Sequence, residues 1–437
     1  MREKTRRPDF CGGEYHRSED FPVNMRIAVV LIALASEPAL GQFFQQGPKL
    51  VGTGAVGNAF QGRSVAMSGD GRTAIVGGNL DNGSAGAAWV WTSSGGVWTQ
   101  QGNKLVGSGA VGNANQGNAS ALSADGNTAI IGGPFDNNNA GAAWIWTRSG
   151  GAWTQQGNKL VGSGAVGSPQ QGFSVSLSAD GNTAIVGGPF DGGPGGGGAW
   201  IWIRSGGAWT QQGNKLVGSG VVGNSSRQGY SVALSADGNT AIVGGYGDNA
   251  ANGAAWVWTR SGNIWTQQGS KLVGLGAVSG VGNSWQGWSA ALSANGDTAI
   301  IGGLTDNNNT GAVWVWKRNA GIWMQQSGKL TASGNTGAAL FGNAVAISAD
   351  GDTAIVGGSS GDGGTWVWTR TGGIWTQQGD KLIGSGASGG AQQGSSVSLS
   401  ADGNTAIVGG PLDKGFAGAA WIFIRPTGPL RRHAVTH

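Results

Sequence analysis

Short runs of alternating apolar and polar residues recur from residue 43 to residue 425, separated by glycine-rich links. In the first complete unit the runs cover residues 63–68, 72–77, 87–92 and 97–105, and this pattern is typical of β-strands. Asp70-Gly71 between the first two runs predicts a two-residue type I′ hairpin turn. Because no useful length of helical period follows residue 41, the pattern predicts an all-β fold.

The four-run unit occurs seven times. The string S-x-D-G-x-T-A-I-[VI]-G-G recurs every 52–58 residues, with its third position at Asp70, Asp125, Asp180, Asp237, Asn295, Asp350 and Asp402. A tryptophan-rich string follows around Trp89, Trp144, Trp200, Trp256, Trp314, Trp366 and Trp421. A third string, W-T-Q-Q-G-x-K-L, begins at Trp98, Trp153, Trp209, Trp265, Trp375 and, in altered form, Trp323. Its seventh copy is F-F-Q-Q-G-P-K-L at residues 43–50.

Seven units of four antiparallel strands at this spacing predict a single seven-bladed β-propeller over residues 42–425. The array begins with a fourth-strand string and ends with a third strand. We therefore expect the N-terminal strand to complete the last blade, which removes two open sheet edges. An open β-solenoid is the alternative, although a solenoid has no need for that strand. Residues 426–437 are interpreted as a C-terminal tail.

Residues 1–41 are interpreted as a signal peptide region. Met25-Arg26 precedes nine apolar residues, 27–35, and Ala39-Leu40-Gly41 gives a small-x-small cleavage site before Gln42, with residues 33–35 as a second candidate. Residues 1–24 either lie upstream of a true start at Met25 or extend the basic part of the signal. The sequence thus predicts export to the periplasm, the cell surface or the medium. No run approaches the ~20 apolar residues of a membrane span.

Composition narrows the chemistry that the repeats can perform. From Gln42 onward there are 20 Lys or Arg and 16 Asp, with no Glu, no Cys and no His before His433. Histidine general bases, Ser-His-Asp or Cys-His systems, His/Cys zinc sites and paired glutamates are therefore excluded. The chain is predicted to be no enzyme and to use no cofactor. The alternative enzyme would rely on Asp, Lys, Tyr230 and Tyr246, for example on an Asp pair facing across the axis to process a glycan.

The unit resembles the FG-GAP repeat of integrin α-subunits and of many exported bacterial proteins. Phe341-Gly342 keeps the literal FG, and Gln-Gly replaces it in the other six copies; Gly-Gly-Pro at residues 132–134, 187–189 and 409–411 is similar to the GAP end. Calcium-binding members carry D-x-D-x-D-G between these half-motifs, whereas here the interval holds one Asp in a tight turn. The resemblance thus implies a propeller with degenerate calcium loops, and no metal is predicted there.

Three further sets of residues are candidates for binding. One Asp follows Gly-Gly in every unit and gives either a weak cation site or an Asx-turn that caps its own loop: Asp81, Asp136, Asp191, Asp248, Asp306, Asp362 and Asp413. One Lys per unit gives either a cationic ring or solvated heads paired with neighbouring Asp: Lys49, Lys104, Lys159, Lys215, Lys271, Lys329 and Lys381. The fourth-strand tryptophans are expected near the outer rim, where they pack or stack on a sugar. Trp285 and Trp288 leave the repeat consensus and are the best single candidates for a role beyond packing.

These features favour an exported, non-catalytic binding, adhesion or scaffold propeller. The predicted binding surface is the end that carries the long loops after the second and fourth strands. Its partner is a polysaccharide, a surface protein or another copy, and a lectin-like polysaccharide binder is the sharper version. No nucleic-acid partner is predicted, because each end mixes both signs of charge.

Overall fold

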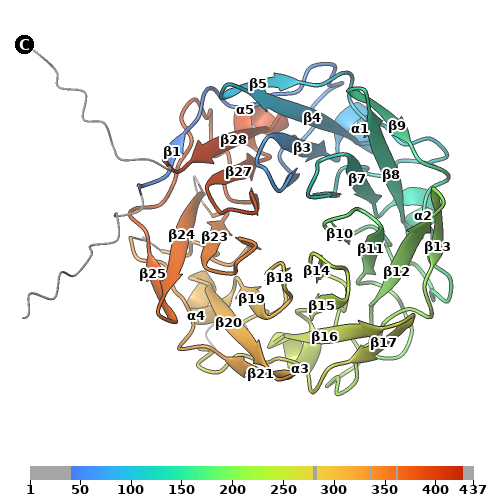
Figure 1. The fold of residues 1–437 in the computed structure, drawn as a ribbon, viewed down its shortest axis with the longest axis vertical. Coiled ribbons are helices and arrows are strands. Elements are labelled where there is room, and N and C mark those ends of the chain that lie inside the picture. The colour runs from blue at the N-terminus through green and yellow to red at the C-terminus, as the bar shows by residue number, and fades with distance from the viewer. Residues whose placement is uncertain (1–40, 279–282, 335–336, 361–362, 427–437) are drawn as a thin grey trace, which may run out of the picture. The chain divides into compact units, whose positions relative to one another are not determined.

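The computed structural model describes residues 41–278, 283–334, 337–360 and 363–426, and in this part of the chain seven four-stranded antiparallel sheets surround one axis (Figure 1). Six sheets use four strands that are consecutive in the chain, and the seventh combines β1 with β26, β27 and β28. The prediction of a seven-bladed all-β propeller is therefore confirmed. The predicted signal peptide region and C-terminal tail lie outside the described residues, apart from Gly41 and Pro426.

The blades are numbered 1 to 7, from the one that begins with β2 to the one that begins with β26. The innermost strands are β2 (Ser64–Met67), β6 (Ala119–Leu122), β10 (Ser174–Leu177), β14 (Ser231–Leu234), β18 (Ser289–Leu292), β22 (Ala344–Ile347) and β26 (Ser396–Leu399). The second strands are β3 (Thr73–Gly78), β7 (Thr128–Gly133), β11 (Thr183–Gly188), β15 (Thr240–Gly245), β19 (Thr298–Gly303), β23 (Thr353–Gly358) and β27 (Thr405–Gly410).

The two outer strands of each blade carry most of the tryptophan. The third strands are β4 (Ala87–Ser94), β8 (Ala142–Ser149), β12 (Gly198–Ser205), β16 (Ala254–Ser261), β20 (Ala312–Asn319), β24 (Gly364–Thr371) and β28 (Ala419–Ile424). The fourth strands are β5 (Val97–Gln100), β9 (Ala152–Gln155), β13 (Ala208–Gln211), β17 (Ile264–Gln267), β21 (Ile322–Gln325), β25 (Ile374–Gln377) and β1 (Phe44–Gln45). The fourth strands end earlier than the sequence predicts, and Leu105 returns to the sheet only as a single bridge to Ala88.

The N-terminal strand closes the ring. β1 pairs antiparallel with β28, with Phe44 opposite Ile424 and Gln45 opposite Phe423. Leu50 continues this edge, and its N–H donates to the carbonyl of Ala420 at 2.7 Å. Blade 7 is thus built from both ends of the array, as the phase of the repeat predicts.

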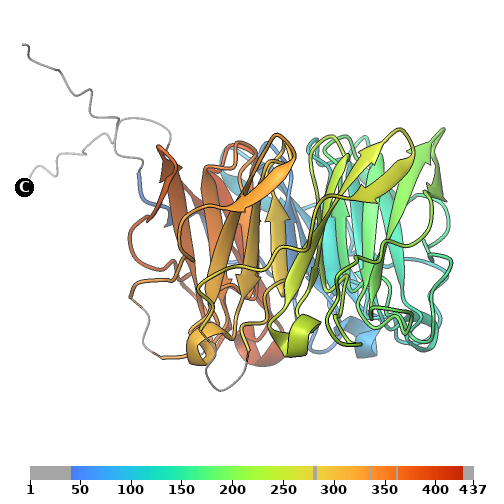
Figure 2. The same ribbon diagram turned by 90° about the horizontal axis from the view of Figure 1, so that it is seen from below.

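The links between strands lie at two ends of the propeller (Figure 2). The tight-turn end carries the links between the first and second strands and between the third and fourth strands. The long-loop end carries the links after the second and fourth strands. Within the described residues, five of its loops contain a single helix-like turn whose central residues have positive φ: α1 (Asp81–Ser84), α2 (Asp136–Asn139), α3 (Asp248–Ala251), α4 (Asp306–Asn309) and α5 (Asp413–Phe416).

The link between β2 and β3 corrects the prediction of a two-residue type I′ turn. That turn requires positive φ at both central residues, but only Gly71 has it, at 68°, and Asp70 does not. The Gly71 N–H donates to Ser68 O at 3.0 Å, while the Asp70 carboxylate accepts from Ser68 Oγ at 2.6 Å and from Arg72 N at 2.9 Å. The prediction is wrong because the Asp side chain binds its own turn and holds a longer link.

The tight turns of neighbouring blades are joined by backbone hydrogen bonds into a closed ring. At this end the N–H of one turn residue donates to the carbonyl of the equivalent residue in the next blade. The seven bonds are Gly69 to Ala124 (2.8 Å), Ala124 to Ala179 (2.9 Å), Ala179 to Ala236 (2.9 Å), Ala236 to Ala294 (2.9 Å), Ala294 to Ala349 (3.0 Å), Ala349 to Ala401 (2.8 Å) and Ala401 to Gly69 (2.9 Å).

The core consists of apolar layers between adjacent blades. In one layer, Ile75 and Val90 of blade 1 pack with Ile131, Trp144 and Trp146 of blade 2. The first tryptophan of each third strand is at most 2% exposed, because neighbouring blades cover both faces of a sheet. Interblade packing, the default interpretation of these tryptophans, is therefore confirmed.

Candidate functional site

The Asp residues after Gly-Gly form buried ion pairs at the long-loop end. Asp81 Oδ2 lies 2.5 Å from Lys104 Nζ of its own blade, and Asp81 Oδ1 accepts from Val56 N, in the loop that enters the blade, at 2.7 Å. The same pair joins Asp136 to Lys159, Asp191 to Lys215, Asp248 to Lys271, Asp306 to Lys329 and Asp413 to Lys49. These six carboxylates are at most 2% exposed. Each one anchors a loop, with a lysine as its cation.

Neither sequence interpretation of these Asp residues describes them fully. Of the six that the structure describes, only Asp191 also caps its own loop, by accepting from Gly193 N at 2.9 Å. Six of the seven lysines are paired with Asp, as one of the two interpretations of the lysine ring proposed. Asp362 lies outside the described residues, and Lys381 of the same blade donates to Gly363 O at 3.4 Å.

The Asp residues of the tight turns are bound by their own turns. Burial of the Asp125 carboxyl would raise its pKa, but hydrogen bonds from the Ser123 hydroxyl and from the Asn127 backbone and side chain outweigh this, with help from Arg148, so the pKa of Asp125 lies below its usual range. The pKa values of Asp180, Asp237 and Asp402 are lowered by the same balance. Two acids outside both repeated positions are paired with arginine: Asp297 with Arg318 at 2.8 Å and Asp352 with Arg370 at 2.7 Å.

The fourth-strand tryptophans brace neighbouring blades. The indole N–H of Trp153 donates to Gln101 Oε1 of the preceding blade at 3.0 Å, and the Arg148 guanidinium lies 5.4 Å from the centre of the same ring. An arginine covers the ring in the same way at Trp209, Trp265, Trp323 and Trp375. Trp98 keeps its bond to a glutamine, Gln46, at 3.0 Å. Trp375 is only 7% exposed, so it offers little surface to a ligand.

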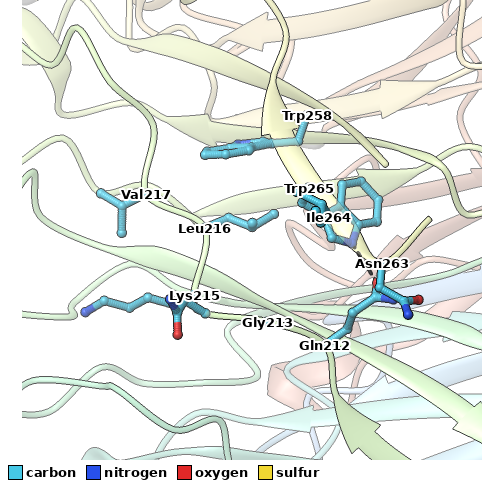
Figure 3. Close-up of a pocket in the computed structure, with 10 residues that line it drawn as sticks. Gln212, Gly213, Lys215, Leu216, Val217, Trp258, Asn263, Ile264 and Trp265 are labelled. Carbon is cyan, nitrogen blue, oxygen red and sulfur yellow. Dashed lines mark hydrogen bonds between the residues drawn. The ribbon is translucent and has the colours of Figure 1, made fainter. Parts of the chain in front are cut away.

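Two of these tryptophans line small grooves between blades. The groove between blades 3 and 4 has a volume of about 340 Å³, and an equivalent groove of about 260 Å³ lies between blades 4 and 5. Figure 3 shows Trp258 and Trp265 beside Leu216 in the larger groove, with Gln212 and Asn263 at one side. Gln212 holds this wall together, because its Oε1 accepts from Trp265 Nε1 at 2.8 Å and its Nε2 donates to Asn263 Oδ1 at 3.0 Å.

The largest departure from the repeat lies around the axis at the long-loop end. The residue directly after each Gln-Gly or Phe-Gly precedes an innermost strand, and we call these seven residues the axial ring. They are Arg63, Asn118, Phe173, Tyr230, Trp288, Asn343 and Ser395. The ring is aromatic in blades 3, 4 and 5 and polar in the other four blades.

The aromatic side of the axial ring extends into a cluster of six rings. We call Phe173, Phe190, Tyr230, Tyr246, Trp285 and Trp288 the aromatic patch. Ring centres are 4.7 Å apart for Phe173 and Tyr230, 4.4 Å for Tyr230 and Trp288, and 5.3 Å for the stacked pair Trp285 and Trp288. All six side chains are partly exposed.

The structure thus brings Trp285 and Trp288 together and joins them, through Tyr230 and Tyr246, to a cluster with Phe173 and Phe190 that sequence reasoning did not group with them. Tyr230 and Tyr246 were considered only as groups for catalysis, and Phe173 and Phe190 were missed. The signal that points to three of the six is the residue after the Gln-Gly step, which changes from blade to blade while the residues around it repeat.

Hydrogen bonds connect the polar side of the axial ring to the patch. Arg63 Nε donates to Asn118 Oδ1 at 3.2 Å, and Asn118 Nδ2 donates to Phe173 O at 3.0 Å. Burial raises the pKa of the Tyr230 phenol, Arg63 opposes this effect and Tyr246 adds to it. Burial lowers the pKa of Arg63, and Tyr230 opposes that shift. The phenol is therefore neutral at physiological pH.

Two general findings bear on the chemistry of these sites. Within the described ranges, no group of three or more His, Cys, Asp or Glu side chains is placed to hold a metal ion. None of the described helices has the length and apolar character needed to cross a membrane.

No known family model matches the chain, and no curated protein matches its sequence.

Proposed function

We propose that this chain is an exported, non-catalytic propeller that binds a polysaccharide through the aromatic patch. The observation that carries the proposal is the patch itself: six partly exposed rings gathered near the axis, three of them at axial-ring positions where the other four blades carry polar residues. Aromatic faces beside amide groups suit the apolar faces and hydroxyls of sugar rings, because one surface supplies both stacking and hydrogen bonds.

The patch is a better candidate than the grooves between blades. The groove tryptophans Trp265 and Trp323 each donate their indole N–H to a glutamine and carry an arginine over one face. Their contacts repeat from blade to blade, as expected of structural braces. Within the described loops a cluster of six such rings occurs once, at the end of the propeller with the longer loops, where recognition is commonly placed on a rigid scaffold.

A non-catalytic role is supported by how the acids are used. Six Asp after Gly-Gly are paired with lysines, and the tight-turn Asp hold their own turns. Export is proposed from the residues 25–41 alone. The order of the Gln-Gly or Phe-Gly step, the Asp-Gly or Asn-Gly turn and the Gly-Gly step, which is Gly-Gly-Pro in three blades, supports a relationship to FG-GAP propellers, which we propose on that order alone.

The experiment uses residues 42–437 and a panel of soluble plant, fungal and bacterial polysaccharides, read by intrinsic tryptophan fluorescence and isothermal titration calorimetry. We expect at least one polysaccharide to bind, and Trp285→Ala and Trp288→Ala to weaken its binding at least tenfold. Trp265→Ala, in a groove, is the matched control and is expected to bind as the parent does. Binding lost in Trp265→Ala but kept in Trp288→Ala would move the site to the grooves. If no polysaccharide of the panel binds and a surface protein binds through the patch, the ligand is a protein and the polysaccharide proposal is wrong.

A further inference from the structure

Arg63 is the arginine around the axis that the repeat does not explain. Its side chain makes one hydrogen bond within the described residues, from Nε to Asn118 Oδ1 at 3.2 Å. Within the described part of the chain it belongs to no ion pair, and Nη1 and Nη2 have no hydrogen-bond partner. The repeated arginines differ: Arg148, for example, covers Trp153 and also bonds to Asn127, Thr73 and Gln101.

The Asp carboxylates of the long-loop end in the same and the next two blades are already paired with lysines. Asp81 of the same blade pairs with Lys104 and is fully buried, and Asp136 and Asp191 of the next two blades are paired in the same way. A second cation, Arg227, lies 4.5 Å from the centre of the Phe190 ring at the edge of the patch. The axial region of the long-loop end therefore presents positive charge without a described counter-ion.

The free face of Arg63 is continuous with the stacking surface. The chain of contacts runs from Arg63 to Asn118, then to Phe173, Tyr230 and Trp288. Arg63 and Tyr230 are also close enough to influence each other's pKa. A planar guanidinium with two free nitrogens can donate two parallel hydrogen bonds to one carboxylate. A partly buried cation is stabilised most by such a partner.

We infer that the axial ring takes an acidic polysaccharide, with the carboxylate of a uronic acid residue on Arg63 and neighbouring sugar rings stacked on the aromatic patch. This inference rests on the proposed function, whose site it shares. A uronic acid carries its carboxylate at the edge of a pyranose ring, so one sugar unit presents both groups to adjoining parts of the site. The neutral Tyr230 hydroxyl adds a hydrogen-bond donor to an arrangement that otherwise favours anions.

The test compares a short oligogalacturonate with its methyl ester, which keeps the sugar backbone and removes the charge. In calcium-free buffer, residues 42–437 are expected to bind the acid about 10- to 100-fold more tightly than the ester, because a hydrogen bond to a charged group is worth about 1.5–3 kcal/mol. Arg63→Gln is expected to remove this preference, because the affinity for the acid falls about 10- to 100-fold and that for the ester falls much less. Arg63→Lys is expected to keep part of the preference, because it keeps the charge and loses the bidentate geometry.

The matched control is Arg72→Gln, which removes an exposed arginine from the same blade at the tight-turn end. It is expected to keep the full preference. Thermal unfolding of each variant shows that the ring is intact. Equal affinity for acid and ester, or a preference that survives Arg63→Gln, overturns the inference while leaving a polysaccharide-binding role in place. If no neutral or acidic polysaccharide binds, the proposed function fails and the inference fails with it.

Discussion

Different contacts hold the turns and loops at the two ends of the propeller. At the tight-turn end, Gly69 and six equivalent alanines link the blades through one backbone hydrogen bond each, and a Ser and an Asp or Asn fix each turn. At the long-loop end, backbone bonds such as Gln116 N to Ala85 O at 3.0 Å also join neighbouring blades, but side chains fix the loops. The Asp–Lys pairs do so within their own blades, and the amide of Gln116 bonds to both N and O of Gly107 at 2.6 and 2.9 Å.

The axial ring marks the positions at the long-loop end where the side chain differs from blade to blade. In each of its seven residues the backbone N–H donates to the carbonyl three positions earlier, for example Phe173 to Gln170 at 3.1 Å and Tyr230 to Arg227 at 3.1 Å. The residue three positions before has positive φ in every blade, 55° at Gln170 and 54° at Trp285. Because a backbone hydrogen bond closes this turn in every blade, the side chain of its last residue varies without loss of the fold. The comparison teaches that the proposed recognition site lies where the scaffold does not depend on the identity of one side chain.

The largest effect expected from this comparison comes from an Asp at the long-loop end. Asp136→Ala leaves Lys159 without its anion and the Val111 N–H without an acceptor, in a site where the carboxylate is 1% exposed. The free energy of unfolding should fall by about 3 kcal/mol or more, because an unpaired, largely buried charge remains. The matched variant at the tight-turn end, Asp125→Ala, removes bonds from an exposed turn and should cost about 1 kcal/mol. Urea unfolding measures both, and equal costs would contradict the distinction between the ends.

Much of this architecture follows from the sequence. The seven copies of the repeat unit predict four strands per blade. The copy of the third string at residues 43–50 predicts that β1 completes blade 7. The type I′ turn was predicted wrongly because a D-G step does not reveal that the Asp70 carboxylate accepts from Ser68 and Arg72. The pairing of Asp81 with Lys104 was one of two open alternatives, since only the fold brings residues 23 positions apart into contact.

The candidate site was predictable only in part, for a similar reason. Trp285 and Trp288 stand out because tryptophan is foreign to those positions of the repeat. Phe190 lies in a Gly-Gly-Pro loop and Phe173 follows a Gln-Gly step, so neither is near the tryptophans in sequence. Their grouping depends on blades 3, 4 and 5 meeting around the axis, which a linear pattern does not contain.

A medium effect is expected where the long-loop end packs a glycine under an indole. A Cβ on Gly107 would lie 2.2 Å from Cδ1 of Trp144, so Gly107→Ala should lower the free energy of unfolding by about 1–3 kcal/mol through overpacking. Blade 6 is the natural contrast: it has Ala332 at the equivalent position, and buried Phe341 replaces the glutamine and packs 5.5 Å from Trp366. Ala332→Gly should therefore change stability by less than Gly107→Ala. Thermal unfolding of the two variants tests this, and a tolerated Gly107→Ala would show that the indole moves freely.

The smallest effect concerns acid at the tight-turn end. The folded-state pKa values of Asp125, Asp180, Asp237 and Asp402 lie below the ordinary value of about 3.9. A carboxyl whose pKa is depressed by folding contributes stability above its unfolded pKa, and this contribution is lost as the pH falls through the folded value. The urea midpoint should thus be steady from pH 7 to about pH 5 and should decline below about pH 4.

Asp125→Asn isolates one of these groups. Blade 5 already carries this change: Asn295 accepts from Ser293 Oγ at 2.7 Å and from Asp297 N at 3.0 Å, the same two bonds that Asp125 makes in its own turn. The variant should therefore fold normally and lose little stability at pH 7. Below about pH 4 its urea midpoint should decline less steeply than that of the parent, because one fewer proton is taken up on unfolding. An unchanged slope would mean that the Asp125 carboxylate gains nothing from its turn, and that the turns depend on the backbone ring alone.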